Sequence, residues 1–391
     1  MKIDEECRSA LMGTLIGLAA LASAMGVGRF AFTPLLPLMQ EHAGLSLGEG
    51  AWLAGANYAG YLVGALACSV VAPAPRHAAR LGLVAVALLT LAMGMTAEHA
   101  AWSILRFAAG VASAYVLVGV SAWALPMLAE RDRSAWSGWV FAGVGVGISL
   151  AGLVGLIAGV GAHAPAGAWL VLGGISAVVA AIAWAPMRTA DLIASSTAQP
   201  ITRFDARAWR LISCYGSFGF GYIIPATFLP AVARELIADP AVFGWIWPAF
   251  GVTAAASTVI ASLCFRRTSA RTVWAMGQLV MAVGVLAPVL FLKVGTLLLA
   301  AVCVGGTFMV VTMAGMQEAR RTAGAGAPRL MAAMTAAFAL GQLAGPLAVG
   351  FAGSIGTDGI AGPSLLAATL LSAGAWALLK RNPVGAVPMP R

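Results

Sequence analysis

Long apolar runs separated by short polar segments repeat along the whole chain. Each run has about 20 residues, which is enough for a helix to cross roughly 30 Å of hydrocarbon. Backbone groups in lipid must be satisfied within each span, and the runs are too long for barrel strands, so they predict an all-α polytopic membrane protein. The pattern predicts twelve transmembrane helices, over residues 9–39, 52–72, 81–97, 102–128, 136–161, 168–187, 209–233, 243–265, 272–292, 296–316, 330–354 and 363–379.

The one long polar segment, 189–207, divides the chain into two halves of similar pattern. We therefore expect an N-terminal six-helix bundle at 1–188, a linker at 189–207 and a C-terminal six-helix bundle at 208–391. Similar residues recur at one constant separation in several helix pairs, which indicates that the two bundles are pseudo-symmetric. The residues that recur at a constant separation of 193 are Gly26 and Gly28 with Gly219 and Gly221, Leu36-Pro37 with Leu229-Pro230, and Ala151-Gly152 with Ala344-Gly345.

Composition and charge agree with a membrane protein. Hydrophobic residues make up 61% of the chain and charged residues 9%, with a mean hydropathy of +0.91, whereas a soluble protein has about 25% charged residues. The net charge of +9 could indicate a nucleic-acid partner, but most Lys and Arg lie in alternate segments between the predicted helices. That positive-inside pattern predicts no nucleic-acid binding, and it places both termini and the linker in the cytoplasm. The apolar run continues past the cleavage-like triplet Ala22-Ser23-Ala24, which predicts an uncleaved first span.

Residue patterns typical of enzymes, channels and receptors are missing from the sequence. The four histidines are isolated and near loops, and the five cysteines lie far apart, so we expect no catalytic residue, metal site or cofactor. No filter-like segment or large extramembrane domain indicates a channel or a receptor. The class that remains is a transporter.

Two arginines lie inside predicted helices, and an intramembrane charge marks a functional site because it costs at least about 2.5 kcal/mol. Arg29 lies among glycines and prolines in the first helix, and Arg106 lies one turn into the fourth. The predicted helices contain no Asp or Glu to pair with them. An anionic substrate could supply the missing charge, with Arg29 as a bidentate carboxylate clamp. Alternatively, Arg29 bonds carbonyl groups freed at a helix kink, and Arg106 is structural or extends to the surface.

Further polar side chains in the predicted helices are candidates for contact with a substrate. Asn57 and Tyr61 share one face of the second helix because they are four residues apart. Tyr215 and Tyr222 share a face of the seventh helix, and Tyr222 occupies the repeat position of Arg29. Each of these side chains could equally serve packing or an interhelical hydrogen bond. The predicted substrate-binding residues are Arg29, Asn57, Tyr61, Arg106, Tyr215, Tyr222 and Gln342.

Motifs around the two arginines resemble those of a known transporter family. The sequence Gly28-Arg29-Phe30 followed by PLLP at 34–37, and the run NYAGYLVG at 57–64, are similar to the bacterial YbfB/YjiJ-type branch of the major facilitator superfamily. Arg106 with Gly110 resembles the arginine-glycine motif of that superfamily's fourth helix. The loop at 74–80 departs from the pattern, because it keeps basic residues but lacks the aspartate that the superfamily often has there.

The resemblance implies a two-bundle transporter that rocks around a central cavity lined by the first, fourth, seventh and tenth helices. We expect a secondary active transporter that moves a small organic anion by alternating access. The alternative is an efflux pump for hydrophobic or drug-like compounds. We expect a monomer that lies in the lipid bilayer of a bacterial inner membrane. Its expected partner is a small-molecule substrate. Co-transport or counter-transport of a proton or another ion, uniport and exchange all stay open.

Overall fold

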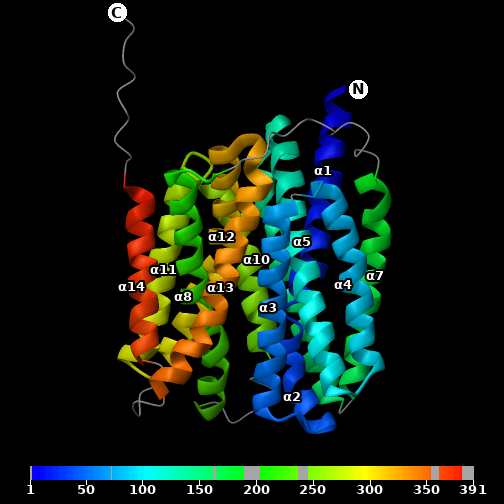
Figure 1. Cartoon of the computed structure of the whole chain (residues 1–391), viewed down its shortest axis with the longest axis vertical. Helices are drawn as coiled ribbons and strands as arrows, with labels where there is room; N and C mark the ends of the chain where they lie inside the picture. Colours follow the sequence, from blue (N-terminus) through cyan, green and yellow to red (C-terminus); the bar gives the residue numbers. More distant parts are fainter. Residues whose placement is uncertain are drawn as a thin grey trace, which may run out of the picture.

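The computed structural model describes residues 2–71, 73–161, 164–188, 203–236, 245–353 and 361–380, and within these ranges it contains helices and no strands. The helices stand side by side and form one elongated bundle (Figure 1). Their bounds are α1 Lys2–Leu21, the π-helix η1 Ala22–Val27, α2 Phe32–Ala43, α3 Leu47–Val71, α4 Pro75–Met95, α5 His99–Glu130, the 3-10 helix η2 Ser134–Trp136, α6 Ser137–Val160, α7 Pro165–Arg188, α8 Ala206–Leu236, α10 Ile246–Cys264, α11 Ala270–Leu290, α12 Val294–Ala323, the 3-10 helix η3 Gly324–Gly326, α13 Ala327–Gly353 and α14 Ala361–Leu379.

Twelve rods cross the bundle in the part of the chain that the structure describes. This number counts α1, η1 and α2 as one rod, here called the first rod, and counts α12 and α13, joined by η3, as two. Ten described segments are long and apolar enough to span a membrane; Val294–Val349 contains both α12 and α13, and α8 lies outside the ten. α1 begins and α14 ends on the same side, which we call the terminal end (Figure 1). The predicted all-α membrane fold is confirmed.

The packing of the helices repeats between the two halves. In the first half α3 packs on α5, and α4 packs on α5 and α7; in the second half α10 packs on α12, and α11 packs on α12 and α14. The halves meet where α3 lies against α13 and where α6 lies against α10, two contacts that are equivalent under the repeat. The structure therefore contains the two predicted pseudo-symmetric bundles. α7 ends at Arg188 and α8 begins at Ala206, but most of the predicted linker, 189–202, lies outside the described residues.

Glycines bring the first rod and α6 into backbone contact. A Cβ atom on Gly143 would lie 2.0 Å from the Leu18 carbonyl oxygen, and one on Gly147 would lie 2.1 Å from the Ala22 carbonyl oxygen. Side chains larger than hydrogen do not fit at such distances, so small residues decide how closely membrane helices approach. Glycines also allow backbone contact in the second half, where α13 packs on α8: a Cβ atom on Gly219 would lie 2.2 Å from the Phe338 carbonyl oxygen.

The first rod is a single span, as predicted over 9–39, but it is interrupted rather than one continuous α-helix. α1 ends at Leu21, η1 follows, and a turn at 28–31 precedes α2. The amide of Gly28 donates to the carbonyl of Ser23 at 2.9 Å, a spacing of five residues that is typical of a π-helix. Wider turns of this kind leave carbonyl groups without their usual helical donors, and the interruption turns Arg29 out of the regular helix.

Arg106 of α5 satisfies the carbonyl groups at this interruption. Its Nη1 donates to the Gly28 oxygen and its Nη2 to the Arg29 oxygen, both at 3.0 Å. Only 3% of Arg106 is exposed, so it does not extend to the surface. A charged donor in a low-dielectric setting makes strong hydrogen bonds to carbonyl oxygens, and these two bonds hold the turn against α5.

A buried acidic residue lies in α12, two positions past the end of the predicted helix 296–316. α12 continues past residue 316 to Ala323, and it carries Glu318 with a 9% exposed side chain. Arg271 of α11 forms an ion pair with this carboxylate at 2.6 Å. The ion pair compensates the Glu318 carboxylate for its lost hydration. An acidic residue can therefore lie in the buried part of α12 near the terminal end.

We predict that Gly147→Ala lowers the thermal unfolding midpoint of the purified protein. The new methyl group would collide with backbone atoms of Ala22 and Gly26, and overpacking of this kind costs about 1–3 kcal/mol. Gly174→Ala in α7 is the control, because nothing lies within 4 Å of its Cβ position. The control should leave the midpoint unchanged or raise it, since alanine favours helix by about 1 kcal/mol over glycine. Equal midpoints for the two variants would contradict the close contact.

We also predict that Arg106→Gln loosens the interruption of the first rod. A glutamine amide is too short and has too few donors to hold both carbonyl groups, and each lost charged hydrogen bond costs about 1.5–3 kcal/mol. Amide hydrogen exchange of the peptide covering 22–31 should become faster in the variant. The exposed Arg207 provides the control, Arg207→Gln, which should leave exchange in this peptide as it is in the parent. Unchanged protection in Arg106→Gln would show that other contacts hold the turn.

Candidate functional site

Arg29 lies at the junction of the two bundles, although it belongs to the first rod. Only 2% of it is exposed. Its guanidinium carbon stands 3.7 Å from the centre of the Tyr61 ring on α3, and 5.5 Å from that of Tyr58. From the other bundle, Gln342 of α13 accepts a hydrogen bond from Arg29 Nη2 through its Oε1. The site is thus built from both halves of the protein.

Three nitrogen atoms at this junction have no hydrogen-bond partner among the described residues. They are Nε and Nη1 of Arg29 and Nε2 of Gln342, all buried. No described carboxylate forms an ion pair with Arg29. Burying a donor without a partner is costly, and for a charged group the cost is larger. The junction therefore presents positive charge and spare N–H donors in a place shielded from water.

Asn57 and Arg106 lie behind Arg29 rather than beside the open donors. Asn57 is fully buried, and its Nδ2 donates to the Arg106 carbonyl oxygen at 2.9 Å. A Cβ atom on Gly110 would lie 2.1 Å from the Asn57 carbonyl oxygen, which shows how closely α3 and α5 approach. Arg106 uses both terminal nitrogens on the backbone at 28 and 29. In this structure the two predicted site residues support the position of Arg29.

Tyr222 of α8 contributes to a row of aromatic rings that reaches the first rod. Its ring stacks on Phe308 of α12, with centroids 5.1 Å apart, and lies 6.1 Å from Phe338 of α13. Phe308 in turn meets Phe30, the neighbour of Arg29, edge to face at 6.3 Å. We call Phe30, Tyr222, Phe308 and Phe338 the aromatic row. It places Tyr222, which was predicted as the repeat partner of Arg29, on the apolar side of the junction.

Tyr215 lies inside the C-terminal bundle beside the aromatic row, with its ring centroid 5.5 Å from that of Phe338. Its ring packs against Trp274 of α11 at 5.6 Å and against Phe218 at 5.4 Å. Its hydroxyl is hydrogen-bonded to Thr312. These contacts are those of a core residue that borders the junction, where Tyr215 lies within electrostatic reach of Arg29 and Tyr61.

The sequence reasoning did not select Phe30, Phe308 or Phe338 for the site. Phenylalanines are frequent in apolar helices, and their spacing in the chain does not show which of them meet across the two bundles. The one available signal was the resemblance, which places the first and tenth helices at the central cavity and so includes Phe30 and Phe308.

Comparisons with known proteins agree with this architecture. The model of the family described as "Uncharacterised MFS-type transporter YbfB" matches residues 21–379. A comparison with curated proteins gives no match. Among solved structures, the crystal structure of the human organic anion transporter MFSD10 (TETRAN) is similar, with a TM-score of 0.72, 14% sequence identity, and coverage of 95% of this chain and 99% of that chain. At this identity the likeness shows the fold alone. The match over nearly the whole sequence shows that this chain belongs to the YbfB-type family of major facilitator superfamily transporters.

Proposed function

We propose that this protein is a secondary transporter that moves a small organic anion by alternating access, with Arg29 as the counter-charge of the substrate. One observation carries the proposal. Arg29 and Gln342 meet at the junction of the two bundles with three buried nitrogens that have no partner in the described structure, and no described carboxylate pairs with Arg29. A carboxylate would supply both the negative charge and the missing acceptors.

The geometry of a guanidinium suits this role. It carries five N–H donors in a planar fork, and Nη2 has two of them. Gln342 takes one of these, which leaves the other to act together with Nη1 or Nε on the two oxygens of a carboxylate. Tyr61 covers one face of the fork, so the substrate would approach along its edge. Lysine could replace the charge but not the pair of parallel hydrogen bonds.

Binding at this place would be linked to the movement of the bundles. Arg29, Tyr61, Gln342 and Tyr222 come from both bundles, and each is at most 2% exposed, so the site is closed in this conformation. The bundles must separate on one side before a solute can enter. An anion that neutralises Arg29 lowers the cost of closing the bundles around it, because a neutralised pair loses less hydration than a lone charge.

The aromatic row indicates that the anion has an apolar body. Tyr222 and Phe308 stack on each other, and Phe308 meets Phe30, the neighbour of Arg29, so these rings would form an apolar wall near the charged fork. A substrate with a carboxylate and an aromatic or aliphatic part would use both features. The human transporter of similar fold is described as an organic anion transporter, and we propose the same broad substrate class here on the basis of the residues above. We also propose that the terminal end faces the cytoplasm of a bacterial inner membrane, as the basic segments predicted.

Efflux of hydrophobic or drug-like compounds is the second candidate function, and the aromatic row is the observation that favours it. Neutral compounds would use the ring faces without the fork of Arg29. The two functions therefore differ in their dependence on one side chain. Cationic compounds fit neither arrangement, because Arg29 would repel them at short range.

We predict that Arg29→Gln lowers the apparent affinity for a transported organic anion at least tenfold in proteoliposomes. A tenfold loss corresponds to about 1.4 kcal/mol, which is modest for a charged hydrogen-bonding pair. Arg29→Lys should recover only part of the affinity, since an ammonium group cannot form the fork. Arg207→Gln, at an exposed position near the start of α8, is the matched control and should transport like the parent.

The substrate is to be found first by screening carboxylates, neutral amphiphiles and cations for thermal stabilisation of the purified parent protein. Organic carboxylates should stabilise it, and Arg29→Gln should remove that effect. Transport of the anion by Arg29→Gln at the parental rate and affinity would refute the clamp. Transport of a neutral compound that is insensitive to Arg29→Gln would support the efflux function instead.

A further inference from the structure

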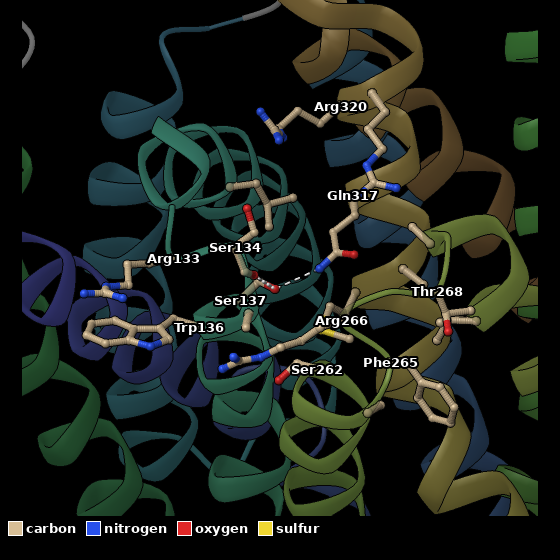
Figure 2. Close-up of a pocket in the computed structure, with 18 of the residues that line it drawn as sticks. Arg133, Ser134, Trp136, Ser137, Ser262, Phe265, Arg266, Thr268, Gln317 and Arg320 are labelled. Atoms are coloured by element: carbon tan, nitrogen blue, oxygen red, sulfur yellow. Dashed lines mark hydrogen bonds between the residues drawn. The ribbon is translucent and has the colours of Figure 1, made fainter. Parts of the chain in front are cut away.

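A second cationic feature lies between the bundles at the terminal end, and the proposed transport site does not use it. It is a cavity of about 320 Å³. Its walls come from the end of α5, η2 and α6 on one side and from α10, α11 and α12 on the other (Figure 2). Residues of both bundles face it, so a ligand bound there would contact both.

Four arginines line this cavity: Arg133 from the N-terminal bundle, and Arg266, Arg320 and Arg321 from the C-terminal bundle. Asp132 is the one acidic residue among the described lining residues. The nearby carboxylate of Glu318 is already held by Arg271. Figure 2 shows Arg266, which follows the end of α10, extending toward the side where Arg133 and Trp136 lie. The lining thus carries an excess of positive charge from two directions.

Neutral hydrogen-bonding groups stand among these arginines. Gln317 of α12 donates through Nε2 to the hydroxyl oxygen of Ser137 on α6 at 2.8 Å, a bond that joins the two bundles within the cavity (Figure 2). Ser262 and Thr268 also line it. Guanidinium and hydroxyl groups together are the usual surroundings of phosphate-type oxyanions in proteins.

The equivalent place in the repeat has no cavity of this size in the described part of the chain, so the fold alone does not produce it. A second, much smaller cavity of about 10 Å³ lies at the pseudo-equivalent place, between α13 and the helices α3 to α5. Four of its lining residues stand 193 positions from lining residues of the cationic cavity. The pairs are Cys68 with Ala261, Pro73 with Arg266, Pro75 with Thr268, and Pro328 with Ala135.

The four arginines and Gln317 of the larger cavity have apolar counterparts under the repeat, whereas Ser262 has Ser69. A proline, a methionine, a leucine, a glycine and an alanine occupy the positions that correspond to the arginines and Gln317, and the cavity there is only about 10 Å³. The pairs at the same separation are Arg266 with Pro73, Arg320 with Met127, Arg321 with Leu128, Arg133 with Gly326, and Gln317 with Ala124. Pseudo-symmetric packing alone would give both halves the same lining, so the charge belongs to one copy only.

We propose that this cavity binds an anion with two or more negative charges, of the phosphate monoester or inorganic phosphate kind, either free in solution or as a lipid headgroup. The anion bridges Arg133 of one bundle and Arg266 and Arg320 of the other. Without it the arginines repel one another across the junction, and with it they attract a common partner. The bound anion therefore holds the bundles together at the terminal end, and it does so less well at high salt.

Binding is tested by calorimetry with inorganic phosphate and glycerol 3-phosphate on the purified full chain. A lipid source is tested by stabilisation in nanodiscs of phosphatidylcholine with and without phosphatidic acid. The double variant Arg266→Gln/Arg320→Gln should bind at least tenfold more weakly, and each single variant should show an intermediate loss. Arg267→Gln is the matched control, because Arg267 is the exposed neighbour of Arg266 and does not line the cavity.

Arg29→Gln should leave the binding of these phosphate probes unchanged, which separates this site from the proposed substrate site. Binding of a soluble probe that the double variant loses supports a free anion as the ligand. Stabilisation by phosphatidic acid alone, lost in the same variant, supports a lipid headgroup. The proposal is overturned if no probe binds, or if the parent and a folded double variant bind all probes equally well.

Discussion

The central architecture depends on the two hydrogen bonds that Arg106 donates to the carbonyl oxygens of residues 28 and 29. A membrane interior offers no water to satisfy a broken helix, so the first rod can be interrupted only where another group takes over its freed carbonyls. The guanidinium on α5 does this with two donors at 3.0 Å. Because the interruption is held in place, Arg29 leaves the helical ladder and reaches Tyr61 on α3 and Gln342 on α13.

The two halves share a packing plan and differ in their charges. Glycines at equivalent helix pairs set close backbone contacts in both bundles, and the contacts of α3 with α13 and of α6 with α10 close the junction in the same manner. Charge departs from this plan at several places, among them Arg29, whose counterpart is Tyr222, Arg106, whose counterpart is Leu299, and Arg266 in the cavity, whose counterpart is Pro73. The two copies thus provide similar walls that differ in the charges they carry.

Several predictions from the chain depended on local pattern and were confirmed by the structure. Run length and hydropathy are properties of each segment alone, which is why the all-helical membrane fold could be predicted. The first helix is one span that is interrupted within its length, and α12 extends past its predicted end at 316 to include Glu318. Both differences involve groups whose cost is compensated by a partner on another helix, Arg106 in one case and Arg271 in the other.

By itself the sequence determined the membrane class, the repeat and the presence of a charged residue, Arg29, within the first helix, because each of these follows from composition or spacing along the chain. Only the tertiary structure decided that Arg106 and Asn57 support the turn, that Tyr215 belongs to a bundle core, and that Gln342 and the aromatic row complete the junction. It also decided that four arginines from two bundles surround one cavity. The physical reason is that hydrogen bonds and charges act over a few ångströms, and helices distant in the chain come that close only after the bundles pack.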